Sequence, residues 1–387
     1  MTAPAAVLTS PAPPAPGQSR HASPTAVASR TSTRVALDEL LTRLVRVGGS
    51  DLHLTVDAAP AFRIHGDLAQ LDDYDVLTPA DTEGLVRAVL SDEQWARFER
   101  EQEIDIAYDI PGVSRFRVNC FQQRNAYGSV MRAIPHEIKP LHELDVPSQI
   151  ERFARLPRGL VLVTGPTGSG KTTTLASLLD LANSERRDHI VTIEDPIEFV
   201  HHHRNCVVNQ REVGVDTRGF SEALKRVLRQ DPDIILVGEL RDLETVSTAL
   251  TAAETGHLVL ATLHTQSAAQ TIDRVIDIFP PHQQQEIRAQ LSTALQGVLT
   301  QALVKRSDGG GRTVVCEVMF ATSAIRNLIR EGKNHQIPSF MQSSGGAGML
   351  TFDQHLADRV HEGKISKEKA LTLCHSVEDF TRLARIA

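Results

Sequence analysis

The sequence predicts an α/β protein in which a small α+β domain precedes a larger domain with a mostly parallel β-sheet. After residue 158, continuous apolar segments alternate with segments of helical periodicity, which is typical of parallel strands buried on both faces. Before residue 134, short segments alternate apolar and polar residues, which is typical of strands with one solvated face. With 387 residues, the chain is long enough for two or three domains.

Composition and charge weigh against several classes of protein. Lys and Arg number 41 and Asp and Glu number 48, so the net charge of −7 disfavours binding of nucleic acid over a large surface. No apolar run approaches the roughly 18 residues that span a bilayer, and we expect no transmembrane segment. The four cysteines form no CxxC pair, so we expect reduced thiols in a cytoplasmic protein.

Proline and polarity patterns divide the chain into four parts. Residues 1–33 are rich in Pro, Ala, Ser and Thr, and they offer too little apolar surface to offset the entropy of ordering, so we expect a disordered tail. The small domain is expected over 34–133 and the larger domain over 158–387. Prolines punctuate residues 134–157, which we expect to be a linker.

The elements of the small domain follow from periodicity and capping residues. Leucines recur at helical spacing over 37–44, and Thr78 and Ser91 are placed to cap two further helices. The expected strands are Leu52–Val56, Phe62–Ile64, Ile104–Ile110 and Val113–Phe121.

In the larger domain, the apolar segments define the sheet. The expected strands are Leu160–Val163, Ile190–Ile193, Ile234–Val237 and Leu258–Leu260. After Pro280 we expect mainly helix, interrupted by one strand near Val314–Phe320.

A glycine-rich loop follows the first of these strands and precedes a helix expected to begin near Thr172. Its sequence matches GxxxxGK[ST] in the strand–loop–helix context that binds nucleoside triphosphates. Glycines let backbone N–H groups face the phosphates, and the helix N-terminus adds partial positive charge. Lys171 is suited to the β- and γ-phosphates of ATP, and the Thr172 hydroxyl to Mg²⁺. The expected nucleotide-binding residues are Gly165, Pro166, Thr167, Gly168, Ser169, Gly170, Lys171, Thr172 and Thr173.

Acidic residues follow two other strands. Asp233–Glu239 is an apolar strand that ends in a carboxylate, as a Walker B strand does, and we expect Thr172, Asp233 and Glu239 to hold Mg²⁺. Glu239 lies at the carboxyl end, where ligands bind in open α/β sheets. Glu194–Glu198 also follows a strand, and its carboxylates could orient or deprotonate the attacking water. Acidic loop residues are common, so this second pattern alone is weak.

Histidines flank the strand Leu258–Leu260. His257 precedes it and His264 follows it, and either could sense the γ-phosphate, although a single histidine at a strand end is more often structural. The tract His201–His203 could bind a metal, but its place after the acidic loop favours a surface segment.

Taken together, these motifs and their order resemble the type II secretion and type IV pilus ATPases. Outside the glycine-rich loop, the segments beginning at Gly49 (GSDLHLT), Ala324 (AIRNLIREGK) and Thr351 (TFDQ) resemble the pilus retraction branch of that superfamily. The resemblance runs from about residue 35 to the end. It implies a PAS-like domain followed by a RecA-like P-loop ATPase domain, in subunits that form a homo-hexamer.

The same resemblance implies roles for individual residues and partners. Glu198 matches the family's catalytic glutamate, Glu239 its Walker B glutamate, and His257 and His264 its two histidines. Arg117 and Arg132 match arginines that reach the phosphates from the N-terminal domain, where guanidinium groups suit developing charge. The implied partners are the pilus machinery and an inner-membrane platform protein, reached from the cytoplasmic face of that membrane.

Other functions stay open on sequence alone. A pilus assembly or type II secretion ATPase, or an accessory retraction paralogue, would carry the same motifs. The AIRNLIREGK segment, and the lack of a long N-terminal extension and of a four-cysteine zinc site, favour retraction. A nucleotide-gated interaction protein with little turnover is disfavoured by Lys171, Glu198 and Glu239. A nucleic-acid translocase is disfavoured by the net acidity and the lack of an aromatic-interleaved basic stretch.

Overall fold

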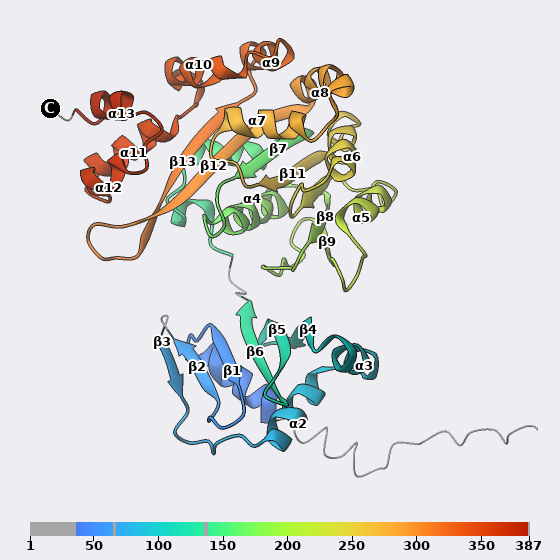
Figure 1. Ribbon diagram of the computed structural model, residues 1–387. Helices are drawn as coiled ribbons and strands as arrows, with labels where there is room; N and C mark the ends of the chain where they lie inside the picture. Colours follow the sequence, from blue (N-terminus) through green and yellow to red (C-terminus); the bar gives the residue numbers. More distant parts are fainter. Residues whose placement is uncertain (1–35, 65–66, 135–137, 386–387) are drawn as a thin grey trace, which may run out of the picture. The chain divides into compact units, whose positions relative to one another are not determined.

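The computed structural model in Figure 1 describes residues 36–64, 67–134 and 138–385. The chain divides into two compact units, Met1–Ala133 and Ile134–Ala387. The tail expected over 1–33 lies outside the described residues. None of the helices described is both long enough and apolar enough to cross a membrane.

The first unit is built on a six-stranded sheet in the order β3-β2-β1-β6-β5-β4. Helical residues 36–46, α2 and α3 bury one face of this sheet, because alternate residues of β1 and β4 share one core with them. Thr78 and Ser91 each form the capping box expected at the start of their helices. The elements are β1 (Asp51–Leu54), β2 (Ala61–Ile64), β3 (Asp67–Gln70), α2 (Pro79–Val89), α3 (Asp92–Glu101), β4 (Glu103–Ile110), β5 (Ser114–Gln123) and β6 (Ala126–Ile134).

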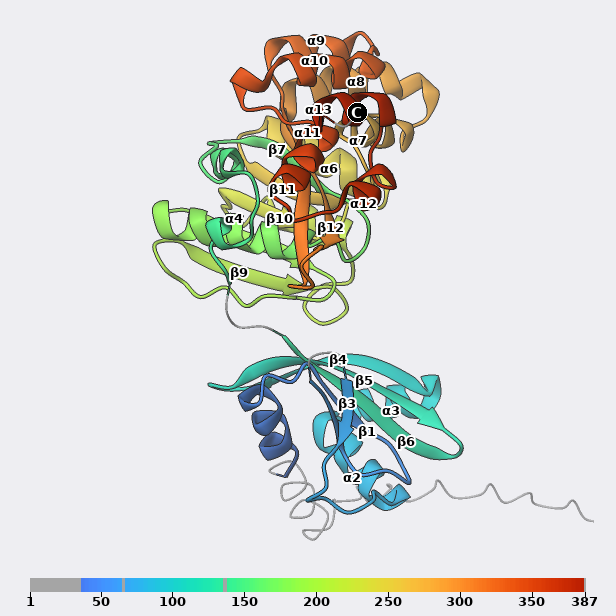
Figure 2. The same cartoon turned by 90° about the vertical axis from the view of Figure 1, so that its left-hand side faces the viewer.

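The second unit is built on a seven-stranded sheet in the order β13-β12-β7-β11-β10-β8-β9. All neighbouring strands are parallel except the pair β12 and β13, which is antiparallel. Helices lie on both faces of the sheet (Figures 1 and 2). The strands are β7 (Gly159–Thr164), β8 (His189–Glu194), β9 (Val207–Glu212), β10 (Ile234–Val237), β11 (Leu258–Leu263), β12 (Leu295–Lys305) and β13 (Arg312–Phe320).

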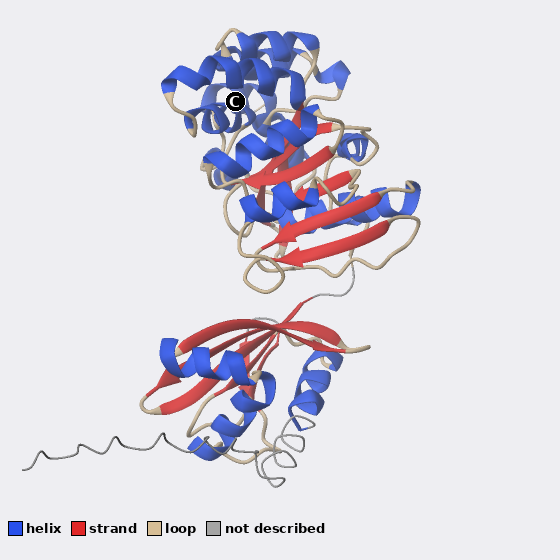
Figure 3. Cartoon of the chain, turned by 90° about the vertical axis from the view of Figure 1, so that its right-hand side faces the viewer, coloured by secondary structure: helices blue, strands red, loops and turns tan. Residues whose placement is uncertain are grey.

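The helices of this unit cover the sheet, and the last of those described ends at Leu383 (Figure 3). Val304 and Val315 of the β12–β13 pair share a separate small core with Phe352, Leu356 and Phe380 of the last helices. The helices are α4 (Lys171–Glu185), α5 (Phe220–Val227), α6 (Leu243–Glu254), α7 (Ala268–Asp277), α8 (Pro281–Ala294), α9 (Ser323–Arg330), α10 (Ile337–Ser343), α11 (Phe352–His361), α12 (Lys367–Leu371) and α13 (Val377–Leu383).

Two sequence predictions about the fold were wrong, and the strands β3, β6 and β9 were not predicted. The segment expected as a linker over 134–157 belongs to the second unit from residue 138 on, because its short helical turns bury Leu141, Ile150 and Phe153 in the core. The region after Pro280 also contains β12, an 11-residue strand that we expected to be helix.

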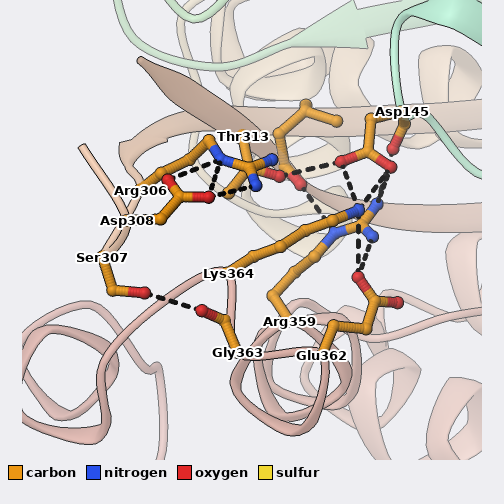
Figure 4. Close-up of polar contacts among 10 residues, drawn as sticks. Asp145, Arg306, Ser307, Asp308, Thr313, Arg359, Glu362, Gly363 and Lys364 are labelled. Carbon is orange, nitrogen blue, oxygen red and sulfur yellow. Dashed lines mark hydrogen bonds and ion pairs between the residues drawn. The ribbon is translucent and has the colours of Figure 1, made fainter. Parts of the chain in front are cut away.

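Charged residues fasten the segment around Asp145 to the last helices, as Figure 4 shows. Both Asp145 carboxylate oxygens accept hydrogen bonds from Lys364 Nζ at 2.8 Å. Arg359 is buried, and its guanidinium donates to the carbonyls of Val314 and Asp145 and to the carboxylate of Glu362. This network joins α11, β13 and the segment around Asp145 within the second unit.

Candidate active site

The glycine-rich loop lies between β7 and α4, at the carboxyl edge of the parallel sheet. Gly165, Gly168 and Gly170 have φ angles of +140°, +76° and +88°, a region that other residues rarely adopt. α4 begins at Lys171, and its N-terminal N–H groups face the loop rather than a preceding turn. The sequence therefore folds locally into the phosphate-binding geometry expected of GxxxxGK[ST].

Lys171 is buried at the centre of this loop. Its ammonium donates hydrogen bonds to the carbonyl oxygens of Gly165 at 2.9 Å and Pro166 at 3.1 Å. Its Nζ also lies 3.5 Å from His264 Nδ1. Burial lowers the pKa of Lys171, while the carboxylates of Glu239 and Glu198 act in the opposite direction. A lysine in this environment gains most from a further anionic partner such as a phosphate.

Glu239 follows β10 and joins two cationic or protonatable groups. Its Oε2 accepts from Arg241 Nη2 at 2.8 Å, and its Oε1 lies 3.2 Å from His264 Nε2. Burial raises the pKa of Glu239, but the hydrogen bond and charge of Arg241, together with His264, lower it further, and the net shift is downward. Glu239 is therefore ionised at neutral pH.

Glu194 lines the same cavity. It ends β8, is buried, and its Oε1 accepts from Thr192 Oγ1 at 2.7 Å and Gln210 Nε2 at 3.0 Å. Burial raises the pKa of Glu194 despite these hydrogen bonds. Glu198 lines this cavity four residues later.

One cavity thus brings together four of the sequence patterns. Its lining includes Thr167, Gly168, Lys171 and Thr172 of the glycine-rich loop, Glu194 and Glu198 of the acidic loop, Glu239 after β10, and His264 after β11. All of these residues lie at or just after the carboxyl ends of parallel strands, where α/β sheets bind ligands.

Two expected site residues lie at the opposite edge of the sheet. Asp233 precedes β10, and its Oδ2 accepts from the backbone N–H of His189, where β8 begins. His257 precedes β11, and its carbonyl accepts from Gly159 N at 2.9 Å, where β7 begins. The predictions that Asp233 ligates Mg²⁺ and that His257 acts in this cavity are therefore wrong for a site within one chain. Each residue precedes its strand, whereas the cavity lies at the carboxyl ends of the strands, a full strand length away.

The remaining candidates lie elsewhere. Arg117 on β5 and Arg132 on β6 belong to the first unit, where they pair with Asp105 at 3.6 Å and Asp51 at 2.8 Å. In the histidine tract, His203 Nδ1 accepts from the backbone of Val208 at 3.0 Å. Among the residues the structure describes, no group of three or more His, Cys, Asp or Glu side chains could hold a metal ion.

The structure adds Gln301 and Arg241 to the site. Arg241 lines the cavity beside Glu239, and the β12 residue Gln301 donates from Nε2 to the Ser169 carbonyl at 2.8 Å. Arg241 lies two residues after the predicted Glu239 and could have been considered with it. Nothing local marks Gln301, because it is 132 residues away from Ser169 in sequence.

Comparison with known proteins identifies the family. Residues 29–371 match the family described as Type II/IV secretion system protein. The chain belongs to this family. The type IV pilus retraction ATPase PilT of Pseudomonas aeruginosa is 50% identical over 344 residues, covering 89% of this chain and 99% of that protein. A twitching motility protein of Neisseria gonorrhoeae is 46% identical over 311 residues, covering 80% of this chain and 83% of the relative.

Solved structures of the family agree with this fold. The pilus retraction motor PilT with bound ADP superposes with a TM-score of 0.84 at 45% identity, covering 89% of this chain and 98% of that one. The ATPase DotB of Legionella pneumophila gives a TM-score of 0.77 at 26% identity, covering 88% and 95%. The predicted fold class, a RecA-like P-loop ATPase domain preceded by a small α+β domain, is confirmed, as is the resemblance to pilus retraction ATPases.

Proposed function

We propose that this family member hydrolyses Mg-ATP as a motor for type IV pilus disassembly and retraction, and so for twitching motility. The observation that carries the proposal is the convergence of Lys171, Glu198, Glu239 and His264 on one cavity beside the glycine-rich loop. The similarity of the chain to the retraction ATPase PilT of Pseudomonas aeruginosa, and to the pilus retraction motor PilT that was solved with bound ADP, supports the same assignment.

The residues present fit a bound Mg-ATP. Backbone N–H groups of the loop and of the first turn of α4 would receive the phosphates, and Lys171 would exchange its contacts with the Gly165 and Pro166 carbonyls for phosphate oxygens. The Thr172 hydroxyl and the ionised Glu239 carboxylate are the oxygen donors that suit Mg²⁺ in this cavity. When bound, Mg²⁺ would neutralise part of the negative charge on the phosphates.

Each side chain then has a distinct task in hydrolysis. Glu198 would orient the attacking water and accept its proton, as a carboxylate beside the phosphates can. His264 lies between Lys171 and Glu239, so it would sense the γ-phosphate and change its contact with Glu239 when that phosphate is present. Arg117 and Arg132 of the first unit are proposed to reach the phosphates and stabilise the charge that develops there.

The proposed assembly is a homo-hexamer at the cytoplasmic face of the inner membrane. It would act on the pilus machinery through an inner-membrane platform protein, without binding nucleic acid. A second candidate is a related pilus ATPase with an accessory role, since PilU of Pseudomonas aeruginosa is 40% identical over 349 residues, covering 90% of this chain and 91% of PilU. Pilus retraction measured in a strain that lacks only this protein would distinguish the two roles. Loss of retraction would indicate a principal motor, and retained retraction an accessory one.

Mg-ATP turnover of the purified protein, measured against protein concentration, tests the proposal. Glu239→Gln keeps the shape of the side chain but removes its charge, so turnover should fall to background. Glu254→Gln is the matched control, because Glu254 is exposed on α6 and its carboxylate accepts a hydrogen bond from Gln290 Nε2 at 2.7 Å, away from the cavity. Specific activity that rises with concentration would support a ring, and turnover equal to that of Glu239→Gln at every concentration would contradict an ATPase.

A further inference from the structure

Gln301 is a buried residue of β12 that contacts the glycine-rich loop from outside the family's recognised motifs. Only 2% of Gln301 is exposed, and its Nε2 donates to the Ser169 carbonyl at 2.8 Å. Ser169 is equally buried. The side chain thus reaches the peptide bond between Ser169 and Gly170, directly before α4 begins.

This hydrogen bond determines which way that peptide unit faces. In a trans peptide the C=O and N–H groups point in opposite directions. Because the Ser169 carbonyl points at Gln301, the Gly170 N–H points away from β12. Gly170 is the residue that caps the N-terminus of α4, where backbone N–H groups bind anions. Gln301 therefore orients one of the amides available to a phosphate.

The backbone of Gln301 restricts the loop as well. A Cβ atom on Gly165 would lie 2.1 Å from the Gln301 carbonyl oxygen, a separation that real atoms do not reach. A Cβ atom on Gly170 would lie 3.2 Å from Gln301 Nε2. Both glycines also need their positive φ angles. Gly165 is thus required by its packing against the backbone of Gln301, and Gly170 by its positive φ angle.

Nothing else in the described structure replaces the Gln301 bond. Gln301 Oε1 and Ser169 Oγ are buried without a hydrogen-bond partner among the described residues, so the carboxamide is oriented by its single bond through Nε2. If that donor were removed, the Ser169 carbonyl would be left buried and unpaired, which is costly.

We propose that Gln301 is a positioning residue for nucleotide binding, which acts by orienting the Ser169–Gly170 peptide toward the phosphates. This proposal rests on the nucleotide site proposed above. It also links that site to the C-terminal helices, because β12 pairs with β13 from Gly297 to Lys305, and β13 packs against α11. Gln301 itself touches no substrate.

The test compares Gln301→Met and Gln301→Glu with the unaltered full-length protein. Met keeps the length of the side chain without a donor, and Glu replaces the donor with an acceptor that faces the Ser169 carbonyl. ADP affinity is measured by calorimetric titration, and kcat and KM for ATP are measured by turnover. We expect the ADP Kd and the KM for ATP to rise about tenfold in Gln301→Met, with kcat within about twofold, as for loss of uniform binding. Gln301→Glu should weaken ADP at least as much.

Thr313→Val is the matched control for general destabilisation. Thr313 is buried on the neighbouring strand β13, and its hydroxyl donates to Asp145 Oδ2 at 2.9 Å rather than to the glycine-rich loop. Its loss should lower the melting temperature but leave the ADP Kd within about twofold. Equal ADP affinity in folded Gln301→Met and the unaltered protein, or equal weakening in Thr313→Val, would overturn the proposal. If the unaltered protein binds no ADP, the nucleotide site itself is refuted.

Discussion

Arg326 lies in the AIRNLIREGK segment, and the structure predicts that its substitution destabilises the second unit. Its guanidinium donates to the carbonyls of Ser292 at 2.7 Å and Thr293 at 2.6 Å, in the last turn of α8. It also donates to the Ala321 carbonyl at 2.9 Å and to Gln296 Oε1 at 3.1 Å. Arg326 therefore joins the C-terminal end of α8 to the first turn of α9. Its positive charge at the C-terminal end of α8 interacts favourably with the dipole of that helix.

The magnitude follows from these four contacts. Hydrogen bonds from a charged donor contribute about 1.5–3 kcal/mol each to stability. Burial of the guanidinium disfavours its charged form, as the lowered pKa of Arg326 shows, and so offsets part of this contribution. Thr293 is exposed, so its carbonyl can regain a water molecule in a variant. For Arg326→Met we expect a net loss of about 2–3 kcal/mol, which lowers the melting temperature of a unit of this size by about 5–10 °C.

Differential scanning calorimetry of the full chain measures this loss. The transition of the second unit is identified as the one that ADP shifts upward. Arg330→Met is the matched control on the same helix, because Arg330 is exposed and donates to Asn327 Oδ1 at 3.2 Å. Surface substitutions of this kind change stability by about 0.5 kcal/mol or less. A melting temperature for Arg326→Met no lower than that of Arg330→Met would refute the structural role.

Three further predictions concern stability and turnover. Burial raises the pKa of Asp145, but the hydrogen bonds from Lys364 and Thr313 and the charges of Arg359 and Lys364 together outweigh it, and the net shift is downward. Asp145→Asn should therefore lose stability in urea titrations at pH 7, and the difference from the parent should shrink as the pH falls through the folded pKa and the carboxyl becomes protonated in both states. Equal stability at pH 7 would count against this. Gly297→Ala places a Cβ 2.4 Å from the Phe153 ring and should cost about 2 kcal/mol, and an unchanged melting temperature would contradict that packing. His264→Ala should lower ATP turnover about 100-fold, whereas His257→Ala should leave the activity of each subunit site unchanged; the reverse order would refute the placement of these residues.

Features that depend on residues close together in the sequence were predicted well from sequence. The spacing of Gly165–Thr172 encodes a loop whose geometry depends on glycine φ angles and on the helix that follows. The parallel strands β7, β8, β10 and β11 were predicted because burial on both faces leaves continuous apolar runs. The capping boxes at Thr78 and Ser91 are equally local.

The errors arose where strand direction or distant packing decides the outcome. Asp233 and Glu239 flank one strand, and only its direction in the sheet shows that Glu239 alone lies beside the glycine-rich loop. His257 and His264 differ for the same reason. The prolines of 134–157 favoured a linker, but Leu141, Ile150, Phe153 and Ala154 of that segment are buried in the core of the second unit, which proline content does not reveal.

Arg326 shows why sequence resemblance alone is ambiguous about mechanism. The resemblance of AIRNLIREGK to retraction ATPases suggests that the segment couples ATP hydrolysis to the pilus, and loss of retraction in Arg326→Ala with intact ATPase activity would be read as support. The intramolecular contacts of Arg326 allow the same phenotype to arise from a displaced α9. Arg330 and Lys333 are exposed, and among the described residues their side chains pair with Asn327 and Glu331 of the same segment, so they test coupling without disturbing α8. Lost retraction in Arg330→Ala or Lys333→Ala, with unchanged melting temperature and turnover, would establish the segment as a docking surface, and normal retraction in both would assign it to the internal packing of the ATPase unit.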